Sequence, residues 1–143
     1  MLFRSVKLLS GITYPVCSKH YLAERGGHVD LATISPNELL HDETQESWKR
    51  WMQVSGAPLS NTTRGLVFQD FNLLTAALFA GHGVALCPVS LFQRELKSGD
   101  LVQISDLPAN ENKAYWMTNM QPGKPEGELF SNWISGIMIA GAI

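Results

Sequence analysis

Polar side chains follow two apolar segments of the sequence, and these are the groups best placed to bind a ligand. Asp70 follows the apolar run from Leu66 to Phe68, and Ser18 follows Val16 and Cys17. Aspartate and serine are good helix N-caps, because their oxygens accept hydrogen bonds from the first backbone N–H groups of a helix. Each site therefore predicts a strand followed by a helix N-terminus that suits a carboxylate or amide ligand.

Two further groups could do chemistry, but each has a plainer structural interpretation. Cys17 beside Ser18 could be a nucleophile at a helix N-terminus, or simply a strand end followed by a helix cap. His41 beside Asp42 could be a base held by a carboxylate, although neighbours in an extended chain point apart. The four histidines have no metal-ligand spacing, and the chain contains no known catalytic or nucleotide-binding signature. We therefore expect no enzyme, no metal site and no cofactor.

The stretch from Leu66 to Pro88 must position Asp70, and it predicts a βαβ unit. After the apolar run, Gly81 is expected to end the helix in a left-handed conformation, and Gly83 to allow a sharp return. The helix itself is predicted from apolar residues at helical spacing, namely Phe71, Leu74, Ala77 and Leu78. Such a unit implies a parallel sheet, whose ligands bind at strand carboxyl ends and helix N-termini. The first place to look for a site is therefore Phe68 to Phe71, and if the strand ending at Ser18 is a neighbour, both helix starts face one crevice.

Composition places the chain among folded globular proteins. It has 143 residues, of which 45% are hydrophobic and 17% charged, with a formal net charge of −2. The lysines and arginines are scattered, so we expect them to be solvated surface charges and not a basic patch that binds nucleic acid. Cys17 and Cys87 are expected to be buried free thiols. The first nine residues are too short and too charged for a signal peptide or membrane span, which predicts a cytoplasmic protein without a membrane partner.

The rest of the chain alternates strand-like and helix-like segments, which predicts an α/β fold. Residues 1–16 are strand-rich, and helices are predicted over 19–25 and 44–54. Trp48 and Trp51 on the second helix are expected in the core, with a stacking wall for a ligand as the alternative. Ser35 and Ser90 each begin a capping box, the first before a strand at 39–41 and the second before a helix ending at Gly99. The remaining predicted elements are strands at 101–104 and 115–120, a loop at 121–125 and a final helix over 129–137 whose apolar end packs on a sheet.

Several segments together resemble the effector-binding domain of LysR-type transcriptional regulators. Pro15-Val16-Cys17-Ser18 is similar to the family's P-V-C-S segment, and Leu39-Leu40-His41 with Trp48-Lys49-Arg50-Trp51 resembles the L-L-H…W-x-x-W pattern of the subgroup of the glycine-cleavage activator and AmpR. The stretch from Phe68 to Pro88 resembles its F-x-D…A-A-x-x-G-x-G-V-A-L-x-P signature. Further resemblance lies in Leu96 to Val102, in Tyr115-Trp116 and in Phe130 to Trp133. The chain departs from the subgroup at Lys19, where proline is usual, and at 32–38, where it resembles a small insertion.

The resemblance implies a periplasmic-binding-protein-like fold of type 2, with one complete subdomain and part of a second. Effector-binding subdomain II would span 17–113, and 1–16 and 114–143 would belong to an incomplete subdomain I. A small-molecule effector would bind between the subdomains and control transcription in a bacterium, in a homo-oligomer formed through the effector domain. The residues that the resemblance assigns to the effector are Cys17, Ser18, Phe68, Asp70, Phe71 and Tyr115.

The family binds DNA through a helix-turn-helix domain, which this sequence lacks, so we expect the chain to be a truncated regulator. Two alternatives stay open from the sequence. One is a solute-binding protein of the same fold, and the other is a non-functional truncated regulator.

Overall fold

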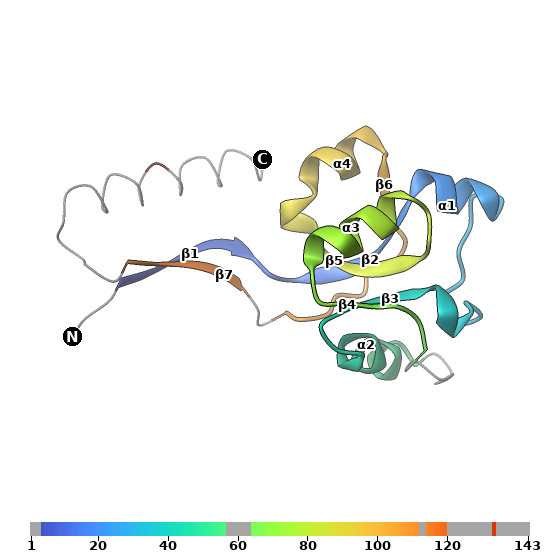
Figure 1. Cartoon of the computed structure of the whole chain (residues 1–143), viewed down its shortest axis with the longest axis horizontal. Helices are drawn as coiled ribbons and strands as arrows, with labels where there is room; N and C mark the ends of the chain where they lie inside the picture. Colours follow the sequence, from blue (N-terminus) through green and yellow to red (C-terminus); the bar gives the residue numbers. More distant parts are fainter. Residues whose placement is uncertain (1–3, 57–63, 112–113, 120–132, 134–143) are drawn as a thin grey trace.

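The computed structural model describes residues 4–56, 64–111, 114–119 and 133, and it contains two sheets. A two-stranded antiparallel ribbon joins β1 (Arg4–Ser10) to β7 (Ala114–Asn119). Figure 1 shows this ribbon extending from a five-stranded sheet that carries the helices. In the described part of the chain, no helix is long and apolar enough to cross a membrane.

The five-stranded sheet is mixed, and its strand order is β4-β3-β5-β2-β6. The strands β3, β4 and β5 are parallel, whereas β2 runs antiparallel to both of its neighbours, β5 and β6. The bounds are β2 (Thr13–Ser18), β3 (Leu39–Asp42), β4 (Val67–Phe68), β5 (Val84–Pro88) and β6 (Leu101–Gln103). The predicted α/β fold is confirmed.

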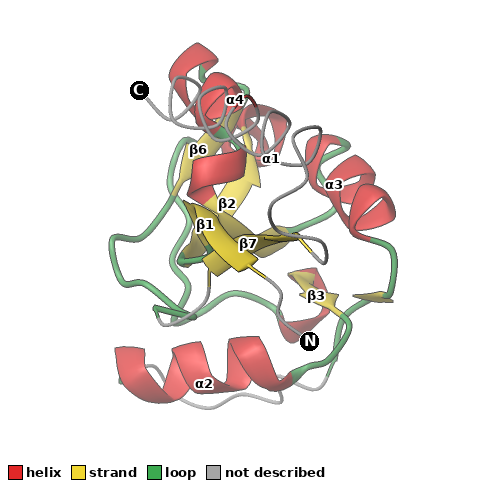
Figure 2. Cartoon of the chain, turned by 90° about the vertical axis from the view of Figure 1, so that its left-hand side faces the viewer, coloured by secondary structure: helices red, strands yellow, loops and turns green. Residues whose placement is uncertain are grey.

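Helices cover both faces of this sheet, as Figure 2 shows with α2 on the side opposite α3 and α4. On one face, Trp48, Trp51 and Met52 of α2 (Glu46–Ser55) pack with Tyr21 of α1 (Lys19–Glu24). On the other face, α3 (Phe71–Phe79) and α4 (Gln93–Ser98) cover a second apolar cluster, which contains Val16, Leu40, Leu74, Leu78, Ala85 and Cys87. The two cysteines are free and buried in different clusters, as expected of structural thiols.

The βαβ prediction is confirmed, with β3 lying between the two strands of the unit. The Asp70 carboxylate caps α3 by accepting from the Asn72 backbone N–H at 2.8 Å. Gly81 adopts a φ of +82°, the left-handed conformation that ends the helix. A Cβ on Gly83 would overlap the Glu38 carbonyl, so β5 approaches the β3 segment too closely for any side chain there.

Both predicted capping boxes are wrong. Pro36–Glu38 forms a short 3-10 helix in which the Ser35 side chain makes no capping hydrogen bond, and Glu38 instead pairs with Arg25. The Ser90 hydroxyl donates to the Ser10 carbonyl at 2.6 Å instead of capping a helix. It lies in a second 3-10 helix (Val89–Leu91), and α4 begins later, at Gln93. In both cases a side chain needed for the cap, Glu38 or Ser90, instead bonds to a residue that is distant in the sequence.

Three sequence predictions fall largely outside the described residues. The loop at 121–125 and the apolar end at 134–143 lie wholly outside them. Of the final helix predicted over 129–137, only Trp133 is described, and it is helical and 60% exposed.

Candidate functional site

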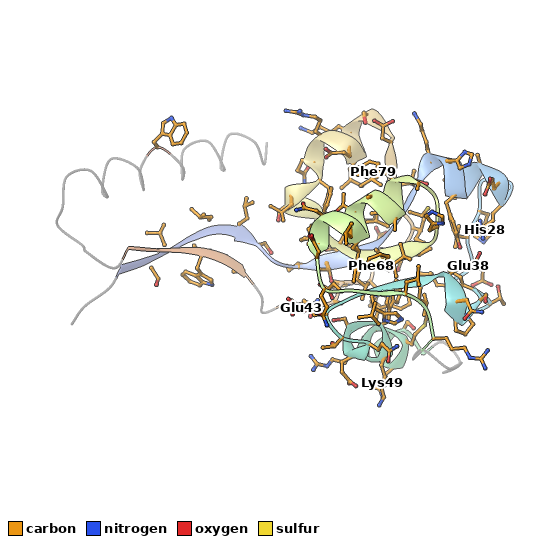
Figure 3. All side chains as sticks on the ribbon, in the orientation of Figure 1. His28, Glu38, Glu43, Lys49, Phe68 and Phe79 are labelled. Atoms are coloured by element: carbon orange, nitrogen blue, oxygen red, sulfur yellow. The ribbon has the colours of Figure 1, made fainter. Side chains whose placement is uncertain are left out.

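The carboxyl ends of the three parallel strands meet at one edge of the five-stranded sheet. The register places Asp42 of β3 beside Phe68 of β4, and the parallel strand β5 ends near them at Pro88. Because β2 is antiparallel, its first residue, Thr13, lies opposite Pro88 at this same edge. In Figure 3, Glu43 and Phe68 lie nearer the β1–β7 ribbon than Glu38 and His28 do. The edge, which we call the carboxyl edge, thus comprises Asp42–Glu43, Phe68–Phe71 and Pro88–Ser90.

The helix N-terminus at this edge is shaped by Asp70 and two aromatic rings. Asp70 is exposed, and its carboxylate caps α3 because one of its oxygens accepts a hydrogen bond from the Asn72 backbone N–H. Phe68 and Phe71 are half-buried, and the Phe71 ring packs on Phe92 with ring centroids 5.9 Å apart. The edge therefore offers apolar ring surface next to a helix N-terminus, which suits an amphiphilic small molecule.

Hydrogen bonds tie the β1–β7 ribbon to this edge. Ser90 donates to the Ser10 carbonyl, and Thr13 exchanges two backbone hydrogen bonds of 2.8 Å with Ala109. The Asn110 side-chain amide adds a donation to the Thr13 hydroxyl at 3.2 Å. The Tyr115 backbone pairs with Leu9 on the ribbon, one position from the Ala114–Ser10 pair, so it lies near this attachment.

Ser18 and Cys17 lie away from the carboxyl edge. Ser18 is the last residue of β2, opposite Leu101, and its hydroxyl packs near Gly81 at the C-terminal end of α3. It accepts from the Tyr21 backbone N–H at 3.1 Å, which confirms the predicted helix cap. The expectation that two helix N-termini face one crevice is therefore wrong, because antiparallel β2 carries Ser18 to the opposite end of α3 from Asp70.

Burial decides the protonation chemistry of the thiols and of the one buried histidine. It raises the pKa of Cys17 to about 11 and that of Cys87 to about 12, so both stay protonated and unreactive at neutral pH. Burial also lowers the pKa of His41, against smaller opposing effects of the Arg64 carbonyl and of Asp42. His41 is 1% exposed while Asp42 is exposed, so the two do not form an accessible acid–base pair.

Two residues with a left-handed backbone frame the carboxyl edge, and the sequence reasoning missed both. Glu43 has a φ of +47° and Asn110 a φ of +56°, which are uncommon for residues other than glycine. Applying the strand-end rule to β3 and β5, as well as to β4, would have found Asp42–Glu43 and Ser90. No local signal points to Asn110, because Thr13, its partner, lies far away in the sequence.

The described residues line several cavities, two of which lie beside α2. One of about 430 Å³ is lined by His28, Trp51 and Ile104, and another of about 370 Å³ by Arg50, Trp51 and Asn110. A third, of about 520 Å³, is lined by Val89 of the carboxyl edge together with Gln93 and Leu96. The Trp51 indole N–H donates to the Leu107 carbonyl at 2.9 Å, and its ring packs edge-on against Trp48. The predicted core role of the tryptophans is confirmed, and Trp51 additionally lines both cavities beside α2. Within the described residues, no cluster of three or more His, Cys, Asp or Glu side chains could hold a metal ion.

Comparison with known sequences gives one family. Residues 2–127 match the family described as LysR substrate binding domain. The AmpR transcriptional activator of Citrobacter freundii is 31% identical over 134 residues, which are 92% of this chain and 45% of that protein. The glycine cleavage system transcriptional activator of Escherichia coli is 29% identical over 116 residues, which are 78% of this chain and 37% of that protein. The chain thus spans less than half the length of these curated relatives.

Comparison with solved structures agrees. The AmpR effector binding domain from Citrobacter freundii superposes with a TM-score of 0.77 at 30% identity, covering 96% of this chain and 68% of that one. The effector domain of AmpR from Pseudomonas aeruginosa gives a TM-score of 0.75 at 23% identity, covering 98% of this chain and 67% of that one, and shows likeness of fold.

Proposed function

The chain belongs to the LysR substrate-binding domain family, and on that premise we propose that it is the ligand-sensing domain of a bacterial LysR-type transcriptional regulator. In this role it binds a small-molecule effector and carries out no catalysis. The observation that carries the proposal is the match over residues 2–127, which includes the whole carboxyl edge, together with the likeness to an effector binding domain.

We propose that the effector contacts the carboxyl edge through Phe68, Asp70 and Phe71. Two half-buried rings beside a capped helix N-terminus support this assignment, because they combine apolar contact with backbone donors. Tyr115 is added from the resemblance, with support from its backbone position on the ribbon. Cys17 and Ser18, which lie at the other end of the sheet, stay predictions that the geometry of this edge does not support.

We further propose that residues 17–113 act as one subdomain, and that 1–16 and 114–143 belong to a second. Thr13–Val16 of β2 already pair with β5 in the five-stranded sheet, so the junction on this side lies between the ribbon, which ends at Ser10, and Thr13. A change of angle at this junction would let an effector bias the conformation. In the whole regulator the domain would form a homo-oligomer in the cytoplasm, and DNA would be bound by a separate helix-turn-helix domain.

Titration of the isotope-labelled chain with the low-molecular-weight fraction of a bacterial lysate tests the site, with NMR as the readout. We expect chemical-shift changes at Phe68, Asp70 and Phe71, and their loss in Phe68→Ala. The matched control is Phe79→Ala, at the opposite end of α3, where a 39% exposed ring is removed without touching the edge. Shifts confined to the cavities around Trp51, or shifts unaffected by Phe68→Ala, would contradict this assignment.

A further inference from the structure

His41 is a buried histidine whose ring makes a single hydrogen bond among the described residues. It is 1% exposed, and its Nε2 lies 2.9 Å from the Arg64 carbonyl oxygen. Because a carbonyl can only accept, Nε2 is the nitrogen that carries a proton in this bond. Nδ1 is buried and has no hydrogen-bond partner in the described part of the chain. The ring is therefore hydrogen-bonded on one side only, and burial, which lowers the pKa of His41, favours the neutral imidazole with Nδ1 unprotonated.

The segment that His41 holds leads directly to the carboxyl edge. The His41 backbone N–H donates to the Leu66 carbonyl at 2.9 Å. His41 is thus hydrogen-bonded to this segment twice, by its ring at Arg64 and by its backbone at Leu66. The strand that follows, β4, has only two residues, lies at the sheet edge and has one described partner strand, β3. Leu66 and Val67 are 57% and 43% exposed, so little apolar burial holds this segment.

We infer that His41 is a positioning residue that keeps β4 and the Phe68–Phe71 turn in place only while its imidazole is neutral. A proton on Nδ1 would put a positive charge and an unpaired donor into a buried position, which is costly unless the ring leaves. Release of the ring frees the Arg64 carbonyl and loosens the segment that carries Phe68. The consequence for effector binding rests on the proposed function, whereas the loosening itself does not.

Few charged groups around His41 could compensate that proton. Asp42, its exposed neighbour on β3, favours the charged form, but burial outweighs it and lowers the pKa of His41. The strand β4 and the helix α3 contain no ionisable side chain beyond the Asp70 cap, and the only one on β5 is the Cys87 thiol, whose pKa burial raises to about 12. The ionisable residues of α2 are exposed, namely Glu46, Lys49 and Arg50.

The direction of the pH dependence follows from the lowered pKa. When the His41 ring is released, it takes up a proton at about pH 6.5, the ordinary pKa of histidine. When the ring is buried against the Arg64 carbonyl, protonation requires a lower pH. The segment is therefore held most firmly by His41 above that pH, and its attachment weakens as the pH falls below it.

Hydrogen exchange of the full chain, followed by mass spectrometry over residues 64–73, tests this inference without any effector. The exchange is measured at pH 7.5 and pH 5.5, about one unit on either side of the ordinary histidine pKa, and corrected for the intrinsic rate at each pH. We expect less protection of this segment at the lower pH in the unmodified chain. In His41→Gln, which keeps a donor near Nε2 but takes up no proton, protection becomes independent of pH.

Two further variants complete the experiment. His82→Gln removes an exposed histidine and should leave the pH dependence unchanged. His41→Leu removes the donor, and exchange of the segment should rise about fivefold at pH 7.5, the factor expected for loss of one ordinary hydrogen bond. A pH dependence that persists in His41→Gln, or one that is missing from the unmodified chain, would overturn the inference.

A second measurement needs no variant. The ¹⁵N shifts of the His41 ring in the unmodified chain should show the Nε2–H tautomer at pH 7.5, and a charged ring or the Nδ1–H tautomer would equally overturn the inference. Failure of the Phe68 titration would leave these results standing, because no ligand is present in them.

Discussion

Ser18 shows how much of a helix start depends on one hydroxyl. The residue is 2% exposed, and its oxygen accepts from the Tyr21 backbone N–H, so it satisfies a donor at the first turn of α1. We expect Ser18→Ala to lower the free energy of unfolding by about 1 kcal/mol, measured by urea denaturation.

The control for that experiment is Ser35→Ala. Ser35 is also the residue before a helical turn, but its side chain makes no capping hydrogen bond. Its replacement should therefore change stability by less than about 0.5 kcal/mol. Equal losses in the two variants would mean that the Ser18 hydroxyl contributes nothing specific.

At the scale of elements, α2 is held to the sheet by its two tryptophans. Trp48 is 1% exposed, and its indole N–H donates to the Leu40 carbonyl at 3.0 Å in the strand beneath. Trp48→Ala removes both this bond and a large buried side chain, and we expect a loss of about 3–5 kcal/mol in the free energy of unfolding. Lys49→Ala, one position along on the exposed face, should cost less than about 0.5 kcal/mol. Circular dichroism in urea measures both, and a small loss for Trp48→Ala would contradict this account of the packing.

Most elements could be predicted from the sequence because their signals are local. The spacing of Trp48 and Trp51 predicts the buried face of α2, and Asp70 with Gly81 predicts the two ends of α3. The capping boxes failed because Ser90 and Glu38 find partners that are distant in sequence, Ser10 and Arg25. Such competition between local and tertiary hydrogen bonds is invisible in a single stretch of chain.

The candidate site could be predicted only in part, for a reason that lies in the sheet. The strand-end rule found Phe68 to Phe71, but it also joined Ser18 to them on the assumption that both strands point the same way. Direction within the sheet is set by pairing, and β2 pairs antiparallel with β5. The hydrogen bond between the His41 ring and the Arg64 carbonyl could not be predicted either, because the two residues are 23 positions apart in the sequence.

At the scale of the whole molecule, a few polar contacts attach the ribbon to the five-stranded sheet. Ser90→Ala removes the hydroxyl that donates to the Ser10 carbonyl at the end of β1. We expect faster hydrogen exchange at residues 10–12, while the melting temperature changes little because the sheet core is untouched. The control is Ser98→Ala, whose hydroxyl is hydrogen-bonded to its near neighbours Glu95 and Asp100. Unchanged exchange at 10–12 would show that the backbone contacts of Thr13 suffice.

The position of β2 inside the sheet also governs when the chain can fold during its synthesis. This strand is synthesised well before its partners, since Val16 pairs with Ala85 on one side and Gln103 on the other. Until Gln103 has been synthesised, Val16 and Cys17, which are both buried in the folded domain, lack their partner strand β6. The stretch from Val16 to Gln103 must therefore be synthesised in full before this sheet can close, and until then its apolar strands are accessible to chaperones and proteases.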